Sequence, residues 1–199
     1  MKALTLLLFL VLNSIYAEFV PNSLFDKVEK KYNKFAKNRF VALNNLLEKT
    51  KDEPTSKKLE KVNDFFNSVK YGIDKDIYGI SDYWANPFEF LAKDKGDCED
   101  YVIAKYLALE YLGIPASKMF LSYVRLKGSS DAHMVLSYYE TPNSEPLILD
   151  NVRKIILPAS KRDDLIFVFN FNPNIKSAGT DNANSKWNKM INQYKGQKI

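Results

Sequence analysis

The hydrophobic periodicity of this chain changes once, near Met119, and divides the sequence into a helical part and an extended part. Before this point, apolar residues recur at three- and four-residue spacings, as they do on one face of an amphipathic helix. After it, apolar runs of strand length are separated by turn residues such as Gly128 and Pro142. Helices followed by an antiparallel meander predict an α+β domain, with N-terminal helices packed on an antiparallel sheet.

The N-terminal helices are predicted from apolar spacing and from helix-breaking residues. Residues 23–50 read as helix in two pieces around Asn38, and Ser56 is expected to cap a second helix. A short helix from Pro87 lies within an aromatic-rich segment. The charged faces of the first two helices indicate a scaffold that packs on the rest of the domain.

The most regular helical pattern follows Cys98. Lys105 and Glu110 are expected to face water, and Gly113 with Pro115 ends the helix. The buried side is predicted to consist of Tyr101, Val102, Leu107, Ala108, Tyr111 and Leu112.

The C-terminal half is predicted to be extended up to Phe171, so that one domain covers residues 18–171. The remaining residues 172–199 read as a polar tail with a short helix around Trp187 to Tyr194. The expected strands are Met119–Leu126, Ala132–Tyr139, Leu147–Asp150, Val152–Leu157 and Leu165–Phe171.

Residues 1–17 have the features of a signal peptide. Lys2 supplies a charged start, Ala3 to Leu12 an apolar run, and Ala17 a cleavage position. The run is short for a membrane span, although Ile15 at position −3 leaves an uncleaved anchor as the alternative. We therefore expect export to the periplasm or beyond, with residues 1–17 removed.

Composition argues against several classes of function. The formal net charge is +5, from 29 basic and 24 acidic residues, and the lysines alternate with acids as on solvated helix faces. No dense basic stripe interleaved with aromatic residues suggests nucleic-acid binding. No glycine pattern of a nucleotide-binding loop is present.

The chain contains one cysteine, Cys98, and one histidine, His133. Cys98 lies at the predicted start of a helix, where the first-turn N–H groups and the helix dipole favour a thiolate. A buried structural cysteine is the simpler alternative, but exported proteins tend to use cysteines in pairs, and this one has acidic neighbours. The pattern therefore indicates a thiol nucleophile and a thiol protease.

His133 and Asp150 lie on two successive predicted strands. Folding residues 132–150 as a hairpin brings the carboxylate close to the imidazole, where it can orient the ring. Asn151 is the alternative partner, since papain-like enzymes use an amide in this role. Each residue alone has a structural explanation, but a helix-start cysteine with both of them favours a Cys-His-Asp hydrolase.

Three acids surround the thiol: Asp97, Glu99 and Asp100. Carboxylates there should raise the pKa of the thiol, so their presence needs a reason. Asp97 and Asp100 suit a capping box, whereas all three suit a hard cation such as calcium, which would cancel their charge. The residues alone leave these two interpretations open. Residues 70–82 contain Asp74 and Asp76 at spacings that fail the EF-hand pattern, and a solvated loop is predicted there.

Several short segments resemble the bacterial transglutaminase-like cysteine proteinases. They span about residues 38–171 and are most specific around the cysteine. The segments are Asp82-Tyr83-Trp84-Ala85 with Pro87, Gly96-Asp97-Cys98-Glu99-Asp100-Tyr101 continuing to Ala104-Lys105-Tyr106, Ala132-His133-Met134-Val135-Leu136, Pro146-Leu147-Ile148-Leu149-Asp150-Asn151, and Arg162 with Asp164-Leu165.

This resemblance implies a papain-like, transglutaminase-like core with the nucleophile at the N-terminus of a central helix. It implies Cys98 as nucleophile, His133 as general base and acid, and Asp150 as the orienting residue. It also implies calcium dependence, with Asp97, Glu99 and Asp100 as ligands.

Adhesin-processing members of the family imply the substrate and partner. The substrate would be the N-terminal region of a large surface adhesin, cut at a paired-alanine site to release the adhesin and disperse biofilm. An inner-membrane cyclic-di-GMP receptor would act as the inhibitory partner. The alternative is a transglutaminase-like acyltransferase that uses the same acyl-enzyme on protein or cell-wall amines.

Overall fold

The computed structural model describes residues 18–129, 131–175 and 177–199. The signal peptide predicted for residues 1–17 lies outside the described residues. Within these ranges, no helix combines the length and apolar character needed to cross a membrane. The helices and strands are α1 (Ser23–Lys31), α2 (Lys34–Thr50), α3 (Thr55–Phe66), β1 (Lys70–Tyr71), α4 (Asp74–Tyr78), α5 (Pro87–Lys93), β2 (Lys95–Gly96), α6 (Cys98–Tyr111), β3 (Met119–Leu126), β4 (Ala132–Tyr138), β5 (Leu147–Leu149), β6 (Leu157–Pro158), β7 (Leu165–Phe171) and α7 (Asp181–Lys195).

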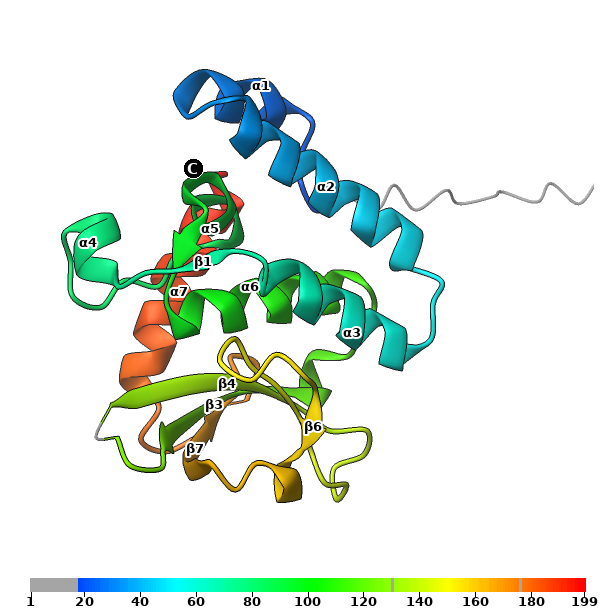
Figure 1. Cartoon of the computed structure of the whole chain (residues 1–199), viewed down its shortest axis with the longest axis vertical. Helices are drawn as coiled ribbons and strands as arrows, with labels where there is room; N and C mark the ends of the chain where they lie inside the picture. The colour runs from blue at the N-terminus through cyan, green and yellow to red at the C-terminus, as the bar shows by residue number, and fades with distance from the viewer. Residues whose placement is uncertain (1–17, 130, 176) are drawn as a thin grey trace, which may run out of the picture.

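Helix α6 is the centre of the fold and lies between the N-terminal helices and the sheet (Figure 1). Helices α3 and α5 pack against one side of α6, and strand β4 packs against the opposite side. Ten consecutive residues of α6, from Asp100 to Leu109, are buried. A helix that is covered on all sides in this way fixes its N-terminus, and with it Cys98, relative to the sheet.

The main sheet is antiparallel, with the strand order β6-β5-β4-β3-β7. The prediction of a simple meander is therefore wrong at its last strand, because β7 pairs with β3 instead of β6. The extended segment predicted for Val152–Leu157 is also wrong, since only β6 is a strand there. The side chain of Asp150 explains this, because it accepts a hydrogen bond from the backbone N–H of Val152 at 3.0 Å and turns the chain.

The first helical region breaks at Tyr32–Asn33, not around Asn38. The Asn33 side chain accepts a hydrogen bond from the backbone N–H of Ala36 at 2.9 Å and caps α2. Helix α3 begins at Thr55 with Pro54 as its N-cap residue, so Ser56, the predicted cap, lies inside the helix.

Two other helix predictions are confirmed, and one detail of α6 is wrong. Asn86 and Glu89 form a capping box at the start of α5, with Pro87 in its first turn. Helix α6 begins at Cys98 as predicted. Lys105, expected to face water, is fully buried.

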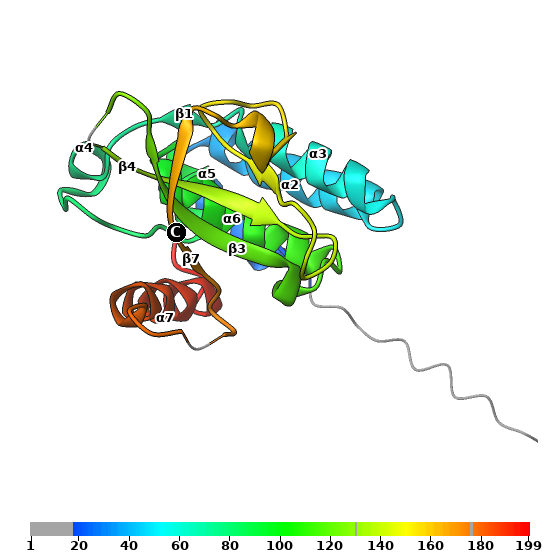
Figure 2. The ribbon, with the colours of Figure 1, turned by 90° about the horizontal axis from the view of Figure 1, so that it is seen from below.

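The C-terminal segment, predicted as a polar tail with a short helix around Trp187 to Tyr194, contains the 15-residue helix α7. Figure 2 shows α7 beside the sheet, near β7. Trp187 packs edge-on against Tyr106 of α6 and Phe171 of β7, with ring centroids 5.3 and 6.4 Å away. Trp187 and Met190 belong to the main core cluster, so α7 is part of the same hydrophobic core.

We predict that Trp187→Ala destabilises the protein by about 3–5 kcal/mol, because it removes a buried aromatic side chain between α6 and β7. Urea unfolding measures the loss. The matched control is the exposed neighbour Asn188→Ala, which should change the free energy of unfolding by less than about 0.5 kcal/mol. Equal effects of the two substitutions would show that α7 does not belong to the folding core.

Candidate active site

Cys98 is the first residue of α6 and is separated from the end of β2 by Asp97 alone. Gly96 precedes it at a position where no side chain fits, because a Cβ atom would lie 2.5 Å from Oδ2 of Asp100 and 2.6 Å from the ring of Phe90. Asp97 is the N-cap residue, but its side chain makes no capping hydrogen bond. The capping-box explanation of Asp97 is therefore wrong, and the position of its carboxylate needs another reason.

The Cys98 thiol donates a hydrogen bond to Oε2 of Glu99 at 3.1 Å. Burial raises the pKa of this thiol well above its usual value, and Glu99 and Asp97 raise it further by charge. A hydrogen bond from the backbone N–H of Met134 on β4 acts in the opposite direction. Without a compensating positive charge, the acids thus hold Cys98 as a neutral thiol.

His133 of β4 and Asp150, directly after β5, form a buried pair. Nε2 of His133 lies 2.8 Å from Oδ1 of Asp150. Leu136 pairs with Leu149 in the sheet, so Asp150 continues along β5 toward the end of β4 that carries His133. With Nε2 directed at the carboxylate, Nδ1 is the ring nitrogen available to act as a base.

Asp150, not Asn151, is therefore the histidine partner, which answers the question that the sequence left open. Burial raises the pKa of Asp150, but hydrogen bonds from His133, Val152 and Arg162 outweigh it and hold the pKa below its usual value. The group is thus a carboxylate at neutral pH and orients the imidazole.

Arg162 completes this cluster, and the sequence analysis gave it no role. Its side chain is 1% exposed, and Nη2 donates to Oδ2 of Asp150 at 2.7 Å. Nε and Nη2 also donate to the two carboxylate oxygens of Asp164, at 2.9 and 2.8 Å. Arg162 therefore fixes the Asp150 carboxylate from the side opposite His133.

A second buried chain of contacts reaches the backbone of Asp150. Nζ of Lys105 donates to Oδ1 of Asn67 at 2.8 Å, and Nδ2 of Asn67 donates to the carbonyl oxygen of Asp150, also at 2.8 Å. Asn67 is the C-cap residue of α3. These contacts connect α6 and the C-terminal end of α3 to the backbone of Asp150, at the end of β5.

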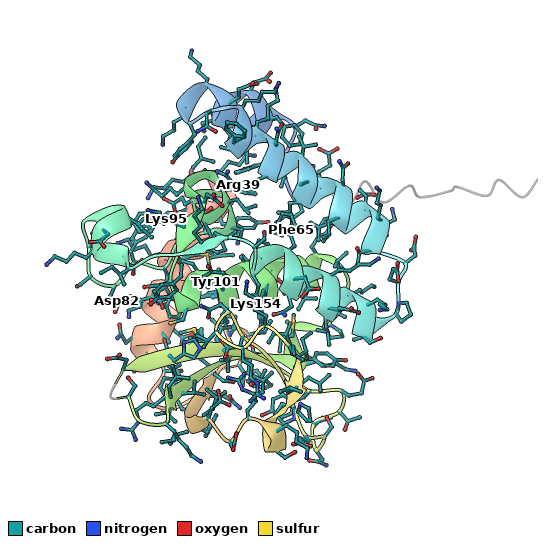
Figure 3. The ribbon with its side chains drawn as sticks, in the orientation of Figure 1. Arg39, Phe65, Asp82, Lys95, Tyr101 and Lys154 are labelled. Atoms are coloured by element: carbon teal, nitrogen blue, oxygen red, sulfur yellow. The ribbon has the colours of Figure 1, made fainter. Side chains whose placement is uncertain are left out.

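The segment that follows Asp150 in the chain is held to α3 by a hydrogen bond. Figure 3 labels Lys154 in front of α6, and its carbonyl oxygen accepts a hydrogen bond from Nδ2 of Asn63 on α3 at 2.7 Å. Tyr101 of α6, also labelled, donates from its hydroxyl to the carbonyl oxygen of Val69 at 2.7 Å. The first contact holds the segment around Lys154 to α3, and the second holds the residue before β1 to α6.

Asp74, Asp97 and Glu99 place one carboxylate oxygen each within 4.8 Å of one another. The prediction of a solvated Asp74 is wrong, because this side chain is buried and accepts the backbone N–H of Tyr83. Asp100 is not in the group; its Oδ1 accepts the backbone N–H of Ala85 at 2.8 Å, and its Oδ2 is buried without a hydrogen-bond partner among the described residues. Only the three-dimensional contact between α4 and β2 brings Asp74 to this site.

These three carboxylates suit a hard cation. Burial and mutual repulsion raise the pKa of Asp74 to about 6 and that of Asp97 to about 10. Oδ1 of Asp74 and Oδ1 of Asp97 are buried without a hydrogen-bond partner among the described residues. A set of oxygen ligands with uncompensated charge fits calcium, for which Asp74, Asp97 and Glu99 would be the ligands.

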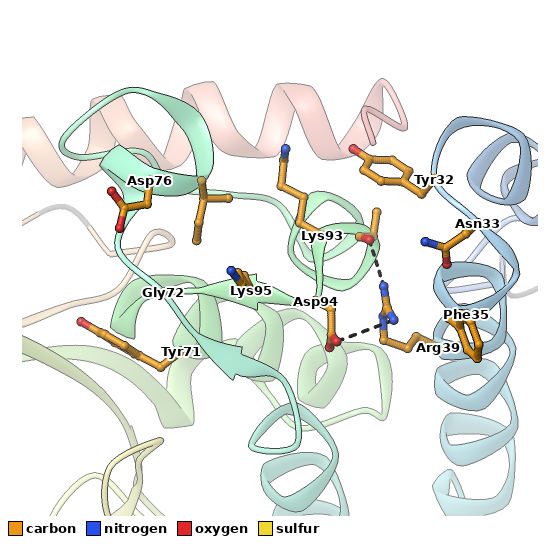
Figure 4. A pocket seen from close by; sticks show the side chains of 12 residues that line it. Tyr32, Asn33, Phe35, Arg39, Tyr71, Gly72, Asp76, Lys93, Asp94 and Lys95 are labelled. Atoms are coloured by element: carbon orange, nitrogen blue, oxygen red, sulfur yellow. Dashed lines mark hydrogen bonds and ion pairs between the residues drawn. The ribbon is translucent and has the colours of Figure 1, made fainter.

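A surface groove of about 640 Å³ lies beside this site, between α2, β1 and β2. Figure 4 shows Arg39 at one wall, where it pairs with Asp94 at 3.8 Å. Tyr71 lines the groove as well, and burial together with the nearby Cys98 and Asp97 raises the pKa of its phenol. The lining of the groove includes neither Cys98 nor His133.

The comparisons with known proteins agree with this arrangement. The family model of the bacterial transglutaminase-like cysteine proteinases matches residues 31–170, so the chain belongs to that family. A search of curated proteins found no match.

Solved structures of LapG from Legionella pneumophila are similar over most of both chains. One is 39% identical with a TM-score of 0.75, and covers 86% of this chain and 96% of the other. An EGTA-treated form is also 39% identical, with a TM-score of 0.74 and the same coverage. A calcium-bound form is 38% identical, with a TM-score of 0.74, and covers 86% of this chain and 97% of the other.

We predict that Lys105→Met changes how stability depends on pH. Burial lowers the pKa of Lys105 to about 7, so between pH 7 and its unfolded value near 10.5 the unfolded state binds more protons. The free energy of unfolding of the wild type should therefore rise by about 1 kcal/mol per pH unit, relative to Lys105→Met, between pH 7.5 and 9.5.

Chemical unfolding at several pH values measures this difference. The matched control is Lys27→Met, at an exposed position of α1, whose stability should run parallel to that of the wild type. Parallel curves for Lys105→Met as well would contradict the burial of a titrating ammonium group.

Proposed function

We propose that this member of the family is a calcium-dependent periplasmic cysteine endopeptidase with Cys98, His133 and Asp150 as its catalytic triad. The observation that carries the proposal is the buried His133–Asp150 pair at 2.8 Å, on the strands next to the helix that begins with the one cysteine of the chain. An imidazole oriented by a carboxylate is what a thiol nucleophile requires of its base.

The reaction begins when Nδ1 of His133 takes the proton of Cys98 and the thiolate attacks a peptide carbonyl. Asp150 stabilises the resulting imidazolium, and backbone N–H groups at the start of α6 stabilise the oxyanion. His133 then protonates the leaving amine, and water hydrolyses the acyl-enzyme. Calcium, when bound, supplies positive charge that neutralises Asp74, Asp97 and Glu99, which lowers the cost of a thiolate beside them.

The proposed substrate is the N-terminal region of a large surface adhesin, cut at a paired-alanine site, so that the enzyme controls adhesin release and biofilm dispersal. Its proposed inhibitory partner is an inner-membrane cyclic-di-GMP receptor. Both parts of this proposal follow from the resemblance to the adhesin-processing members of the family. Export under the signal peptide predicted for residues 1–17 would bring enzyme, substrate and receptor into one compartment.

We predict that Cys98→Ala abolishes cleavage of a purified adhesin fragment with a paired-alanine site, because no other thiol is present. Circular dichroism should show an unchanged fold. Gel analysis and mass spectrometry of the products measure the reaction. Hydrolysis gives a new carboxylate, whereas an amine-linked product would favour the acyltransferase, and cleavage by Cys98→Ala would exclude the mechanism.

We predict that EDTA stops cleavage and that added calcium restores it. Asp74→Asn should raise the calcium concentration needed for half-maximal activity by about 10-fold or more, because it removes a charged ligand. The matched control is Asp76→Asn, two residues away on α4 at an exposed position, which should behave like the wild type. Activity that is insensitive to EDTA would contradict the metal requirement.

A further inference from the structure

Helix α7 contacts the Asp82–Trp84 segment, which precedes the first turn of α5. Lys186 of α7 forms an ion pair with Asp82, and its ammonium group also lies 5.7 Å from the ring centroid of Trp84. Figure 3 shows Asp82 beside this helix. One lysine of α7 therefore holds both residues that flank Tyr83 in the chain.

The side chain of Tyr83 is buried and is held by α5, by α7 and by the residues after α7. Its hydroxyl oxygen lies 3.0 Å from Oε1 of Gln193 on α7 and 2.9 Å from Oε1 of Glu89 on α5. Nζ of Lys198 donates to the same hydroxyl at 2.6 Å and pairs with Glu89 at 3.0 Å. Lys189 of α7 adds an ammonium group 6.0 Å from the ring centroid. Helix α7 thus contacts every residue of the segment.

Tyr83 in turn holds Asp74, the first residue of α4 and a proposed calcium ligand. The backbone N–H of Tyr83 donates to Oδ2 of Asp74, and the Tyr83 ring packs against Tyr78 of the same helix, with ring centroids 4.4 Å apart. Oδ1 of Asp74 is buried without a hydrogen-bond partner among the described residues, so it is the oxygen left for a cation. A ligand that is already oriented by such a contact loses less freedom when the metal binds.

Tyr83 is placed by its side-chain contacts, because the chain before it is exposed. Residues 79–82 are exposed, and Tyr83 is the first buried residue after them. The chain after Tyr83 has its own anchor, since the backbone N–H of Ala85 donates to the buried Asp100 at 2.8 Å. The contacts with α7 therefore limit the movement of the Tyr83 N–H relative to Asp74.

We propose that α7 positions Asp74 for calcium through the Asp82–Trp84 segment, with Lys186 and Gln193 as the positioning residues. The inference rests on the calcium site of the proposed function and extends it. It makes the affinity for calcium depend on a helix that contains none of the three proposed ligands.

Lys186 allows the effect of positioning to be separated from the effect of charge. Burial raises the pKa of Asp74 to about 6, and the charge of Lys186 acts in the opposite direction, so this lysine lies near enough to repel a cation at Asp74. By charge alone, loss of the lysine would therefore tighten calcium binding. Loss of a positioning contact weakens binding, so the two effects have opposite signs.

Isothermal titration of calcium into the protein, after EDTA treatment and dialysis, measures the dissociation constant without substrate. We expect Lys186→Met to raise this constant by about 10-fold, the lower end of the loss seen when a partner of a metal ligand is removed. Gln193→Leu, which leaves the charge unchanged, should act in the same direction. Lys186→Arg keeps the ion pair and should bind calcium like the wild type. The matched control is Lys195→Met, an exposed position on α7, which removes the same charge and should change the constant by less than about 2-fold.

Thermal unfolding in EDTA gives the stability of each variant, and the titrations are done well below the unfolding transition, so that a loss of affinity is separated from unfolding. An unchanged or lower constant for Lys186→Met, or an equal increase for Lys195→Met, would overturn the proposal. If the wild type binds no calcium, the calcium requirement of the proposed function fails together with this inference. If the wild type binds calcium and the α7 variants bind it equally well, only the role of α7 is wrong.

Discussion

The buried carboxylate of Asp150 is the interaction on which the rest of the site depends. Each of its oxygens has a defined donor, His133 Nε2 at 2.8 Å on one and Arg162 Nη2 at 2.7 Å on the other. Its carbonyl oxygen is held by Asn67, which in turn accepts from the buried Lys105. A buried charge is tolerated only where such partners surround it. The fold therefore has to bring α3, α6, β4, β5 and the segment with Arg162 together at one point, and this arrangement also fixes the imidazole.

The acids near Cys98 form a contrasting environment. Asp150 is paired with Arg162, whereas Asp74, Asp97 and Glu99 place one carboxylate oxygen each within 4.8 Å of one another and form no ion pair with a described residue. Two of them have a pKa raised by burial and repulsion, and the thiol that donates to Glu99 is affected in the same direction. In the proposed mechanism, this site therefore combines a histidine base, oriented by Asp150, with a thiol whose ionisation depends on a bound cation.

Local patterns in the sequence were sufficient for much of the fold. The apolar spacing after Cys98 predicted α6, and the alternating runs predicted β3, β4 and β7. The errors came from long-range contacts that no local pattern contains. Asp74 reads as a loop residue until α4 packs beside β2, and Lys105 reads as a surface residue until its hydrogen bond to Asn67 is seen. Strand β7 crosses to the far edge of the sheet, where it pairs with β3. The candidate site was predictable to the extent that its residues start a helix or end a strand. Arg162 and Asp74, which act through partners distant in sequence, were not.

The rate at which iodoacetamide alkylates Cys98, measured against pH with calcium and with EDTA, tests the central claim most directly. The readout is unambiguous because the chain has one cysteine. The account predicts that calcium lowers the pH at which alkylation reaches half its maximal rate, that EDTA reverses the change, and that Asp74→Asn weakens it. A profile that is the same with calcium and with EDTA would show that the acid cluster does not control the thiol, and would contradict the account.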